Sequence, residues 1–270
     1  MEFSSYKLSN SSEIRNKIME IILKANKTIM SFYKENNLQV NFKEDDSPLT
    51  KADISAHKLI VQGLKELIPE LPIVSEEDKK SHMVGKFTDK FWLIDPLDGT
   101  KEFIKGTEEF TCNVALIENN KSTYGFVGVP AKNQIYFGGK GFGSFKRDAN
   151  GEISQINCQK HEDKIYVVAS QSHLNNATKL FIDSIKEPYE LIRAGSSLKF
   201  IKIAEGLAHL YPRMAPTSEW DTAAAHSVLE GAGGIVIQTN RENLIYGKEN
   251  ILNPSFIAIS DINLLPETVN

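Results

Sequence analysis

The chain has 270 residues, of which 41% are hydrophobic and 24% are charged, and its formal net charge is −4. This length and composition are those of an ordinary globular protein, with room for one large domain or two compact lobes. The small net charge and the lack of a basic block argue against a nucleic acid polymer as partner, whereas a few local cations can still hold a small anionic substrate.

The two cysteines, Cys112 and Cys158, form neither a metal-type spacing nor a disulfide framework. This usage fits a reducing compartment. The N-terminal segment lacks a secretory signal, and no apolar run is long enough for a membrane span. We therefore expect a cytoplasmic protein without an integral membrane segment. Weak peripheral association with the cytoplasmic face of the inner membrane stays open.

The first half of the chain begins with two predicted helices. Apolar residues recur at helical spacing from Ile14 to Phe32, after a start pattern Asn10-x-x-Glu13, and a second helix is predicted over 50–68. Two long helices ahead of successive strands indicate helices layered on a largely antiparallel sheet. The predicted strands are 71–75, 90–94, 111–118, 123–129 and 134–139.

A polar stretch at 146–164 is the predicted boundary between two lobes. Beyond it, strands and helices alternate, which indicates an α/β lobe. The predicted strands are 165–170, 190–194, 208–213 and 234–239, and the helices lie near 175–186, 197–205 and 221–230. The predicted class is thus α+β, with an α+β lobe over 1–150, an α/β lobe over 151–270 and a ligand cleft between them.

The segment FWLIDPLDGTKEF (91–103) carries two aspartates at the end of an apolar strand. Pro96 and Gly99 predict a tight turn that folds back, brings Asp98 near Asp95 and points the Leu97 carbonyl at the same place. Buried carboxylates are costly without a positive partner, and oxygen donors of this kind suit Mg²⁺. The alternative is an Asx-turn that caps the next segment, although such a turn needs only one carboxylate.

Two further acids are candidates for the same site. Glu76 follows the strand 71–75, where an acidic triplet is by itself typical of a solvated turn, and Asp221 begins an alanine-rich helix, where it is by itself typical of a cap. If both converge with the aspartate pair, four carboxylates repel one another unless divalent cations lie between them. Two such cations would form a clamp for phosphoryl transfer.

These segments together resemble the inositol monophosphatase superfamily. The signatures are SEED (75–78), WLIDPLDGTKEF (92–103) and WDTAAAH (220–226), and SPLTKAD (47–53) and GSSLKF (195–200) extend the resemblance over nearly the whole chain. The resemblance implies a layered α/β/α/β/α sandwich of two lobes. It also implies a magnesium-dependent phosphatase with two or three Mg²⁺ ions in each active site.

Residue roles follow from the resemblance alone. It implies that Glu76, Asp95 and the Leu97 carbonyl bind one Mg²⁺ and that Asp95, Asp98 and Asp221 bind the second. The water that attacks the phosphate would be oriented by Glu76 together with the hydroxyl that follows Gly99 in the motif.

That hydroxyl belongs to Thr100, which we therefore count with Glu76 as catalytic. Asp53 and Thr50 match positions near a third metal or the water network, and Asp53 is also counted as catalytic. Their alternative roles are the first-turn acid and the cap of the second helix.

The substrate is also inferred from the resemblance. Lys101-Glu102-Phe103 stands where inositol monophosphatases commonly have Thr-Asn-Phe, as in the bisphosphate nucleotidase branch, whose members convert adenosine 3',5'-bisphosphate to AMP in sulfur assimilation. The implied substrate contacts are Glu76, Leu97, Asp98, Gly99, Thr100, His173, Ser196, Lys199, Arg213 and Asp221.

Among them, Ser196, Lys199 and Arg213 would hold a nucleotide phosphate, and His173 would lie near the nucleotide. The alternatives are ordinary surface charge for the two cations and a helix N-cap for Ser196.

Two other functions remain open. One is an inositol or other sugar phosphatase on the same fold, and the other is a non-catalytic nucleotide sensor. Intact Glu76 and Thr100 argue against a sensor, because binding alone needs no residues that orient water. The resemblance further implies inhibition by lithium.

Overall fold

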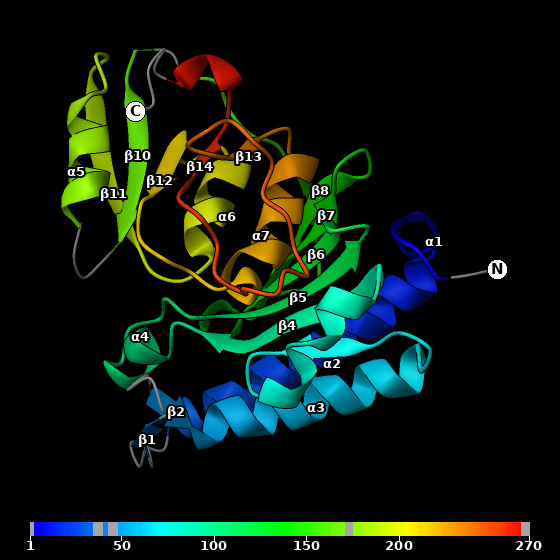
Figure 1. Ribbon diagram of the computed structural model, residues 1–270. Coiled ribbons are helices and arrows are strands. Elements are labelled where there is room, and N and C mark those ends of the chain that lie inside the picture. The colour runs from blue at the N-terminus through cyan, green and yellow to red at the C-terminus, as the bar shows by residue number, and fades with distance from the viewer. Residues whose placement is uncertain (1–2, 35–39, 43–47, 162, 171–174, 266–270) are drawn as a thin grey trace.

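The computed structural model describes residues 3–34, 40–42, 48–161, 163–170 and 175–265 (Figure 1). The α-helices of this part are α1 (Ser5–Asn10), α2 (Ser12–Lys34), α3 (Lys51–Leu67), α4 (Thr100–Ile104), α5 (Asn176–Asp183), α6 (Leu198–Ala204) and α7 (Glu219–Gly231). Short 3-10 helices lie at Lys79–Ser81, Val84–Phe87, Pro130–Lys132 and Ile262–Leu264.

The strands form one small and two large sheets. They are β1 (Val40–Phe42), β2 (Pro48–Thr50), β3 (Ile73–Ser75), β4 (Lys90–Asp98), β5 (Thr111–Glu118), β6 (Lys121–Val129), β7 (Gln134–Gly139), β8 (Gly143–Arg147), β9 (Ile153–Ile156), β10 (Ile165–Ser170), β11 (Tyr189–Ala194), β12 (Leu210–Arg213), β13 (Ile235–Gln238) and β14 (Phe256–Ile259).

The large sheets and the helices stack in five layers (Figure 1). Helices α2 and α3 cover one face of a seven-stranded sheet, and α6 and α7 lie between that sheet and a five-stranded sheet, with α5 on the far side of the second sheet. The predicted α/β/α/β/α sandwich is confirmed.

The seven-stranded sheet has the order β3-β4-β5-β6-β7-β8-β9. Every neighbouring pair is antiparallel except β3 and β4, so the predicted, largely antiparallel sheet is present. Because successive side chains of a strand point to opposite faces, β4 supplies both cores: Phe91 and Leu93 join the cluster around α7, and Trp92 and Ile94 join the one beneath α2 and α3.

The five-stranded sheet has the order β11-β10-β12-β14-β13. Strand β10 is parallel to β11 and β12, and β14 is antiparallel to β12 and β13. The alternation of strands and helices predicted here is therefore present, but β14 was not predicted from the sequence.

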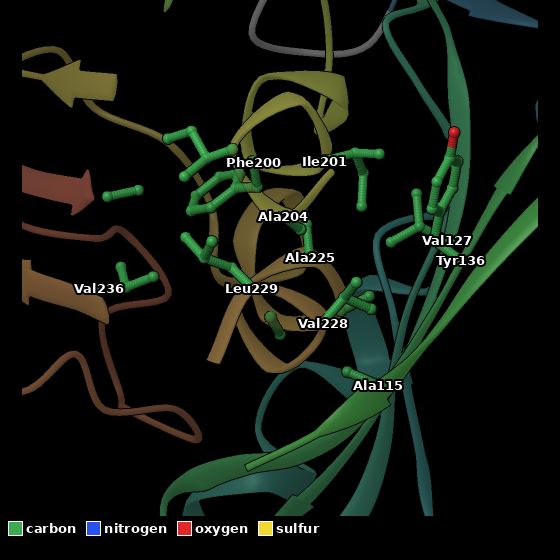
Figure 2. Packing of buried hydrophobic residues seen from close by; sticks show 14 of the residues in the cluster. Ala115, Val127, Tyr136, Phe200, Ile201, Ala204, Ala225, Val228, Leu229 and Val236 are labelled. Atoms are coloured by element: carbon green, nitrogen blue, oxygen red, sulfur yellow. The ribbon is translucent and has the colours of Figure 1, made fainter. Parts of the chain in front are cut away.

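Helix α7 packs closely against the first sheet because the residues at the contact are small. Its residues Ala223, Ala224 and Ala225 are buried, and a Cβ on Gly125 of β6 would lie 2.0 Å from the Ala224 carbonyl oxygen. Figure 2 shows Ala225 and Val228 of this helix in the core between the layers. Such close contact fixes helix α7 against the first sheet, and it therefore also fixes the position of the first turn of the helix.

The start of α2 differs from the prediction. Asn10 is the last residue of the short helix α1, and the Ser11 hydroxyl accepts the hydrogen bond from the Ile14 amide at 3.3 Å. The capping role predicted for Asn10 is therefore wrong. The Glu13 side chain instead pairs with Lys17 one turn later, at 2.7 Å.

The predicted division at residue 150 stays a prediction. Strand β9 extends the first sheet to Ile156, and α7, from the second half of the chain, packs on β5, β6 and β7 of the first sheet. No helix in the described part of the chain is long and apolar enough to cross a membrane.

Candidate active site

A β-bulge brings the first two aspartates together. Asp95 lies opposite Asn113 and Asp98 lies opposite Thr111, so β4 carries one residue more than β5 between these pairs. The predicted fold-back between the aspartates is wrong, because the strand continues through Asp98. The Leu97 amide donates to Asp95 Oδ1 at 3.0 Å, so the alternative Asx-type hydrogen bond is also present.

Gly99 ends the strand in a conformation that favours glycine. Its φ is +88°, and a Cβ would lie 3.0 Å from the Glu109 carbonyl oxygen and 3.3 Å from the Ser196 Cβ. The chain can therefore turn sharply into α4 while the segment around Ser196 packs against it.

Asp221 completes an acidic trio. One carboxylate oxygen each of Asp95, Asp98 and Asp221 lies within 4.8 Å of the other two. Asp221 is also the third residue of α7, and its Oδ2 accepts a hydrogen bond from the Ser218 amide at 2.8 Å in a capping box. The residue thus stabilises the helix start and also lies in the acidic cluster, so its capping role is confirmed, while its role as a metal ligand stays a prediction.

Glu76 joins the trio from the neighbouring strand. Strand β3 is parallel to β4, and the Glu76 amide donates to the Ile94 carbonyl at 3.2 Å, which places Glu76 beside Asp95. A hydrogen bond between the two side chains is among the causes that raise the Asp95 pKa. The four acids that the sequence picked out therefore lie together.

Burying these carboxylates without a cation costs free energy. Burial is the largest cause that raises the pKa of Asp95 well above its usual range, followed by the charges of Glu76 and Asp98. The Asp221 pKa is raised in the same way, by burial and then by Asp98 and Glu76. Within the described residues, the buried Asp95 Oδ2 has no hydrogen-bond partner. An unsatisfied carboxyl oxygen among hard oxygen donors fits Mg²⁺.

Asp53 and Thr100 form a second polar pair beside the acids. The Thr100 hydroxyl lies 3.2 Å from Asp53 Oδ1 and 3.1 Å from the Leu97 carbonyl oxygen, and can donate to either. Asp53 also accepts a hydrogen bond from the Thr50 amide at 2.8 Å, which confirms Thr50 as the cap of α3. Burial raises the Asp53 pKa to about 6, against the opposing effect of the Thr50 hydrogen bonds.

A cleft of about 170 Å³ adjoins the acids. Its walls include Asp98 and Gly99 on one side and Ser196, Lys199, Arg213 and Asp221 on the other. A larger hollow of about 440 Å³ lies between α2 and α3, on the far side of the first sheet from α7. We assign the site by its chemistry and not by size, because the smaller cleft is lined by Asp98 and Asp221 of the acidic trio.

Lys199 is buried at the wall of this cleft. It is 7% exposed, so the alternative of an ordinary surface charge is wrong for this residue. Its Nζ donates to the Ser196 carbonyl at 2.6 Å and lies 5.4 Å from the centre of the Tyr211 ring. Burial is the largest cause that lowers the Lys199 pKa to about 8.

Arg213 reaches the cleft from the end of β12. Its Nε donates to the Ala215 carbonyl at 3.1 Å and its Nη2 to the Pro216 carbonyl at 3.3 Å. These bonds fix the guanidinium against the loop that leads to α7, and leave further N–H groups for an anion.

Ser196 has a backbone conformation that is unusual for a residue with a side chain. Its φ is +53°, and its hydroxyl donates to Asp98 Oδ2 at 2.6 Å. The N-cap residue of α6 is Ser197, so the capping alternative for Ser196 is wrong. A contact from Ser196 to a phosphate stays a prediction, as does that from His173, which lies outside the described residues.

Three polar residues behind the acids were not predicted from the sequence: Thr111, Asn113 and Ser197. All three are almost completely buried, and Ser197 donates its amide to Asp98 Oδ2 at 2.7 Å. Thr111 and Asn113 alternate with apolar residues in TCNVALIE, and this was the available signal, since buried polar residues on one face of a strand need partners.

A model of the inositol monophosphatase family matches residues 10–264, and the chain belongs to this family. One relative, the 3'(2'),5'-bisphosphate nucleotidase CysQ of Salmonella typhimurium, is 43% identical over 215 residues, which cover 79% of this chain and 86% of the relative. The protein of the same name from Escherichia coli K12 is 40% identical over 89% of this chain and 97% of the relative.

Solved structures show the same fold. The crystal structure of CysQ from Bacteroides thetaiotaomicron, a bacterial member of the same family, matches with a TM-score of 0.81 and 38% identity over 93% of this chain and 99% of that chain. The suhB protein of Bartonella henselae shares the fold, with a TM-score of 0.77 and 23% identity over 94% of this chain and 96% of that chain.

Proposed function

We propose that the protein is a Mg²⁺-dependent phosphomonoesterase that hydrolyses the 3'-phosphate of adenosine 3',5'-bisphosphate, leaving AMP and phosphate, in sulfur assimilation. The observation that carries the proposal is the trio Asp95, Asp98 and Asp221 beside a cleft that also holds Lys199 and Arg213. The similarity to proteins named as bisphosphate nucleotidases supports the same substrate.

The acids would hold two Mg²⁺ ions, one with Glu76, Asp95 and the Leu97 carbonyl and one with Asp95, Asp98 and Asp221. A third would lie near Asp53. Bound Mg²⁺ supplies a water of lowered pKa and neutralises charge on the phosphate.

Thr100 and Glu76 would orient the attacking water. When the Thr100 hydroxyl donates its proton to Asp53, its oxygen lone pairs are free to accept a hydrogen bond from that water. With a pKa of about 6, Asp53 is mostly ionised at pH 7 and can accept the Thr100 proton. Glu76 would take the proton that the water loses.

Lys199 and Arg213 would bind the phosphate that the reaction leaves on the nucleotide. Both line the cleft together with Asp98, so a nucleotide whose 3'-phosphate reaches the acids can place its 5'-phosphate near the two cations. Charge-assisted hydrogen bonds to phosphate are strong and directional. An inositol phosphatase needs no such cations, and a sensor needs no pair like Asp53 and Thr100.

The two sides of the cleft would correspond to residues 1–150, with most of the metal ligands, and 151–270, with Asp221 and the phosphate contacts. The nucleotide is proposed as a small-molecule partner of a cytoplasmic enzyme. Weak association with the inner membrane stays a prediction.

Phosphate release from four substrates tests the function. Adenosine 3',5'-bisphosphate, adenosine 3'-phosphate, inositol 1-phosphate and fructose 1,6-bisphosphate would each be assayed with MgCl₂ and with excess EDTA. We expect the highest kcat/KM for the adenosine bisphosphate, and no turnover in EDTA or in Asp95→Asn. A preference for inositol 1-phosphate would overturn the substrate, and full activity in EDTA would overturn the metal mechanism.

A further inference from the structure

Behind Asp98, three buried side chains and the partly buried side chain of Ser196 form a continuous line of hydrogen bonds. Thr111 Oγ1 lies 2.6 Å from the Ser196 hydroxyl and 2.8 Å from the Ser197 hydroxyl, and Ser197 Oγ lies 3.0 Å from Asn113 Oδ1. The Ser196 hydroxyl in turn lies 2.6 Å from Asp98 Oδ2. We call Asn113, Ser197, Thr111 and Ser196 the polar chain.

The direction of the protons in the polar chain can be deduced. A carboxylate only accepts, so Ser196 gives its single hydroxyl proton to Asp98. Thr111 Oγ1 also lies 3.5 Å from Asp98 Oδ2, but the Ser196 hydroxyl is much closer, at 2.6 Å, so Thr111 gives its own proton to Ser196. Ser197 therefore donates to Thr111 and needs a donor itself. Asn113 Nδ2 is buried and has no partner among the described residues, and exchanging the amide oxygen and nitrogen of Asn113 supplies that donor.

Every proton of the polar chain then points toward Asp98. Hydrogen bonds arranged head to tail polarise one another, so the bond that ends on the carboxylate is strengthened by those behind it. The hydroxyl of Ser196 and the amide of Ser197 both end on Asp98 Oδ2, at 2.6 and 2.7 Å. Oδ1 accepts neither of these bonds and keeps its lone pairs for a cation.

The polar chain also connects the two sides of the cleft. Thr111 and Asn113 lie on β5 of the seven-stranded sheet, whereas Ser196 and Ser197 lie between β11 and α6, beside the five-stranded sheet. The Ser196 carbonyl, moreover, accepts the hydrogen bond from Lys199 Nζ. One residue thus contacts both a proposed metal ligand and a proposed phosphate ligand.

We infer that Thr111 is a positioning residue for the cation at Asp98. Resting on the proposed function, this inference assigns to the Thr111 hydroxyl the task of orienting Ser196, which in turn fixes the Asp98 carboxylate. Residues that orient a metal ligand typically contribute about 10- to 100-fold to metal affinity. Because Thr111 acts through Ser196, we expect the lower end of that range.

The test compares Thr111→Val, which has nearly the same shape without a hydroxyl, with Thr111→Ser, which keeps the hydroxyl. Thr123→Val is the matched control, since Thr123 is also a strand threonine whose hydroxyl donates to a carboxylate, that of Glu118, at 2.7 Å. Mn²⁺ affinity of the substrate-free protein would be measured from the electron paramagnetic resonance signal of free Mn²⁺, and folding from the thermal unfolding midpoint.

We expect Thr111→Val to weaken Mn²⁺ binding about tenfold, Thr111→Ser to stay within about threefold of wild type, and Thr123→Val to leave the affinity unchanged. Should Thr111→Val fail to fold, Ser197→Ala provides the same test, because it shortens the polar chain but keeps the backbone N–H that donates to Asp98. Wild-type affinity in the folded variant would overturn the inference, and so would equal weakening in Thr111→Val and Thr111→Ser.

Failure of the proposed substrate is distinguishable from failure of this inference. The Mn²⁺ titration contains no phosphate ester, so a wild-type protein that prefers inositol 1-phosphate would overturn the substrate alone. If Thr111→Val binds Mn²⁺ like wild type while the adenosine bisphosphate remains the preferred substrate, only the role of Thr111 is overturned.

Discussion

Replacing Lys199 by methionine tests the proposed substrate most directly. The ammonium lies at the wall of the cleft, held by the Ser196 carbonyl at 2.6 Å and by the face of Tyr211. Methionine has a similar length and is apolar, so it can fill the space of a side chain that is only 7% exposed. The variant thus removes the charge and largely preserves the packing.

The expected loss follows from the bond that Lys199 would make. A hydrogen bond between a charged donor and phosphate contributes ~1.5–3 kcal/mol, which corresponds to about 10- to 150-fold in kcat/KM. The thermal unfolding midpoint should not fall, because the variant also removes the cost of burying an ammonium, a cost seen in the lowered Lys199 pKa.

The assay is kcat/KM for adenosine 3',5'-bisphosphate and for adenosine 3'-phosphate, which lacks the second phosphate. We expect the large loss only on the bisphosphate. Lys202→Met is the control, since Lys202 lies one turn further along α6 and does not line the cleft. Equal losses on both substrates, or a loss in Lys202→Met as large as that in Lys199→Met, would refute the assignment of Lys199 to the second phosphate.

Three other predictions concern the chemistry. Thr100→Ala should lower kcat by at least about tenfold and change KM far less, because the role proposed for Thr100 is chiefly to orient the attacking water; a change in KM alone would contradict this role. Because the Lys199 pKa is lowered to about 8, the ammonium loses its proton as the pH rises through that value. The kcat/KM for the bisphosphate should therefore decline above about pH 8 in wild type but not in Lys199→Met, and pH profiles of the two proteins would test this. Lithium chloride should inhibit turnover at concentrations where sodium chloride does not, because Li⁺ can enter a Mg²⁺ site with half the charge; equal effects of the two salts in the phosphate-release assay would exclude this.

The parts of the fold that the sequence predicted are those with strong local patterns. Strands β5 and β7 have the predicted bounds because each contains a run of apolar residues, VALI in β5 and IYF in β7. Strands β8 and β9, the last two strands of this sheet, were not predicted; β9 is the edge strand, and it lies with the end of β8 inside the polar stretch 146–164. Most residues of these two strands are at least partly exposed, so polar side chains are stable there.

The acids were predictable because their motifs are local, but their geometry was not. DPLDGT indicated that Asp95 and Asp98 lie together, whereas the bulge depends on the pairing of β4 with β5 and cannot be deduced from β4 alone. The contacts of Thr111 with Ser196 and Ser197 join residues 85 and 86 positions apart. No short-range pattern encodes a contact of that kind.

The distance along the chain between Asp98 and Asp221 has a consequence for how the protein is made. More than a hundred residues separate them, and α7 must pack on the first sheet before its aspartate reaches the other two. A nascent chain that has produced β4 and β5 therefore lacks the complete cation site. Ions that bind only the finished fold stabilise it by mass action, by about 2.7 kcal/mol at a concentration one hundred times Kd. The magnesium level of the cell would then determine how long each molecule escapes proteolysis, besides how fast it turns over its substrate.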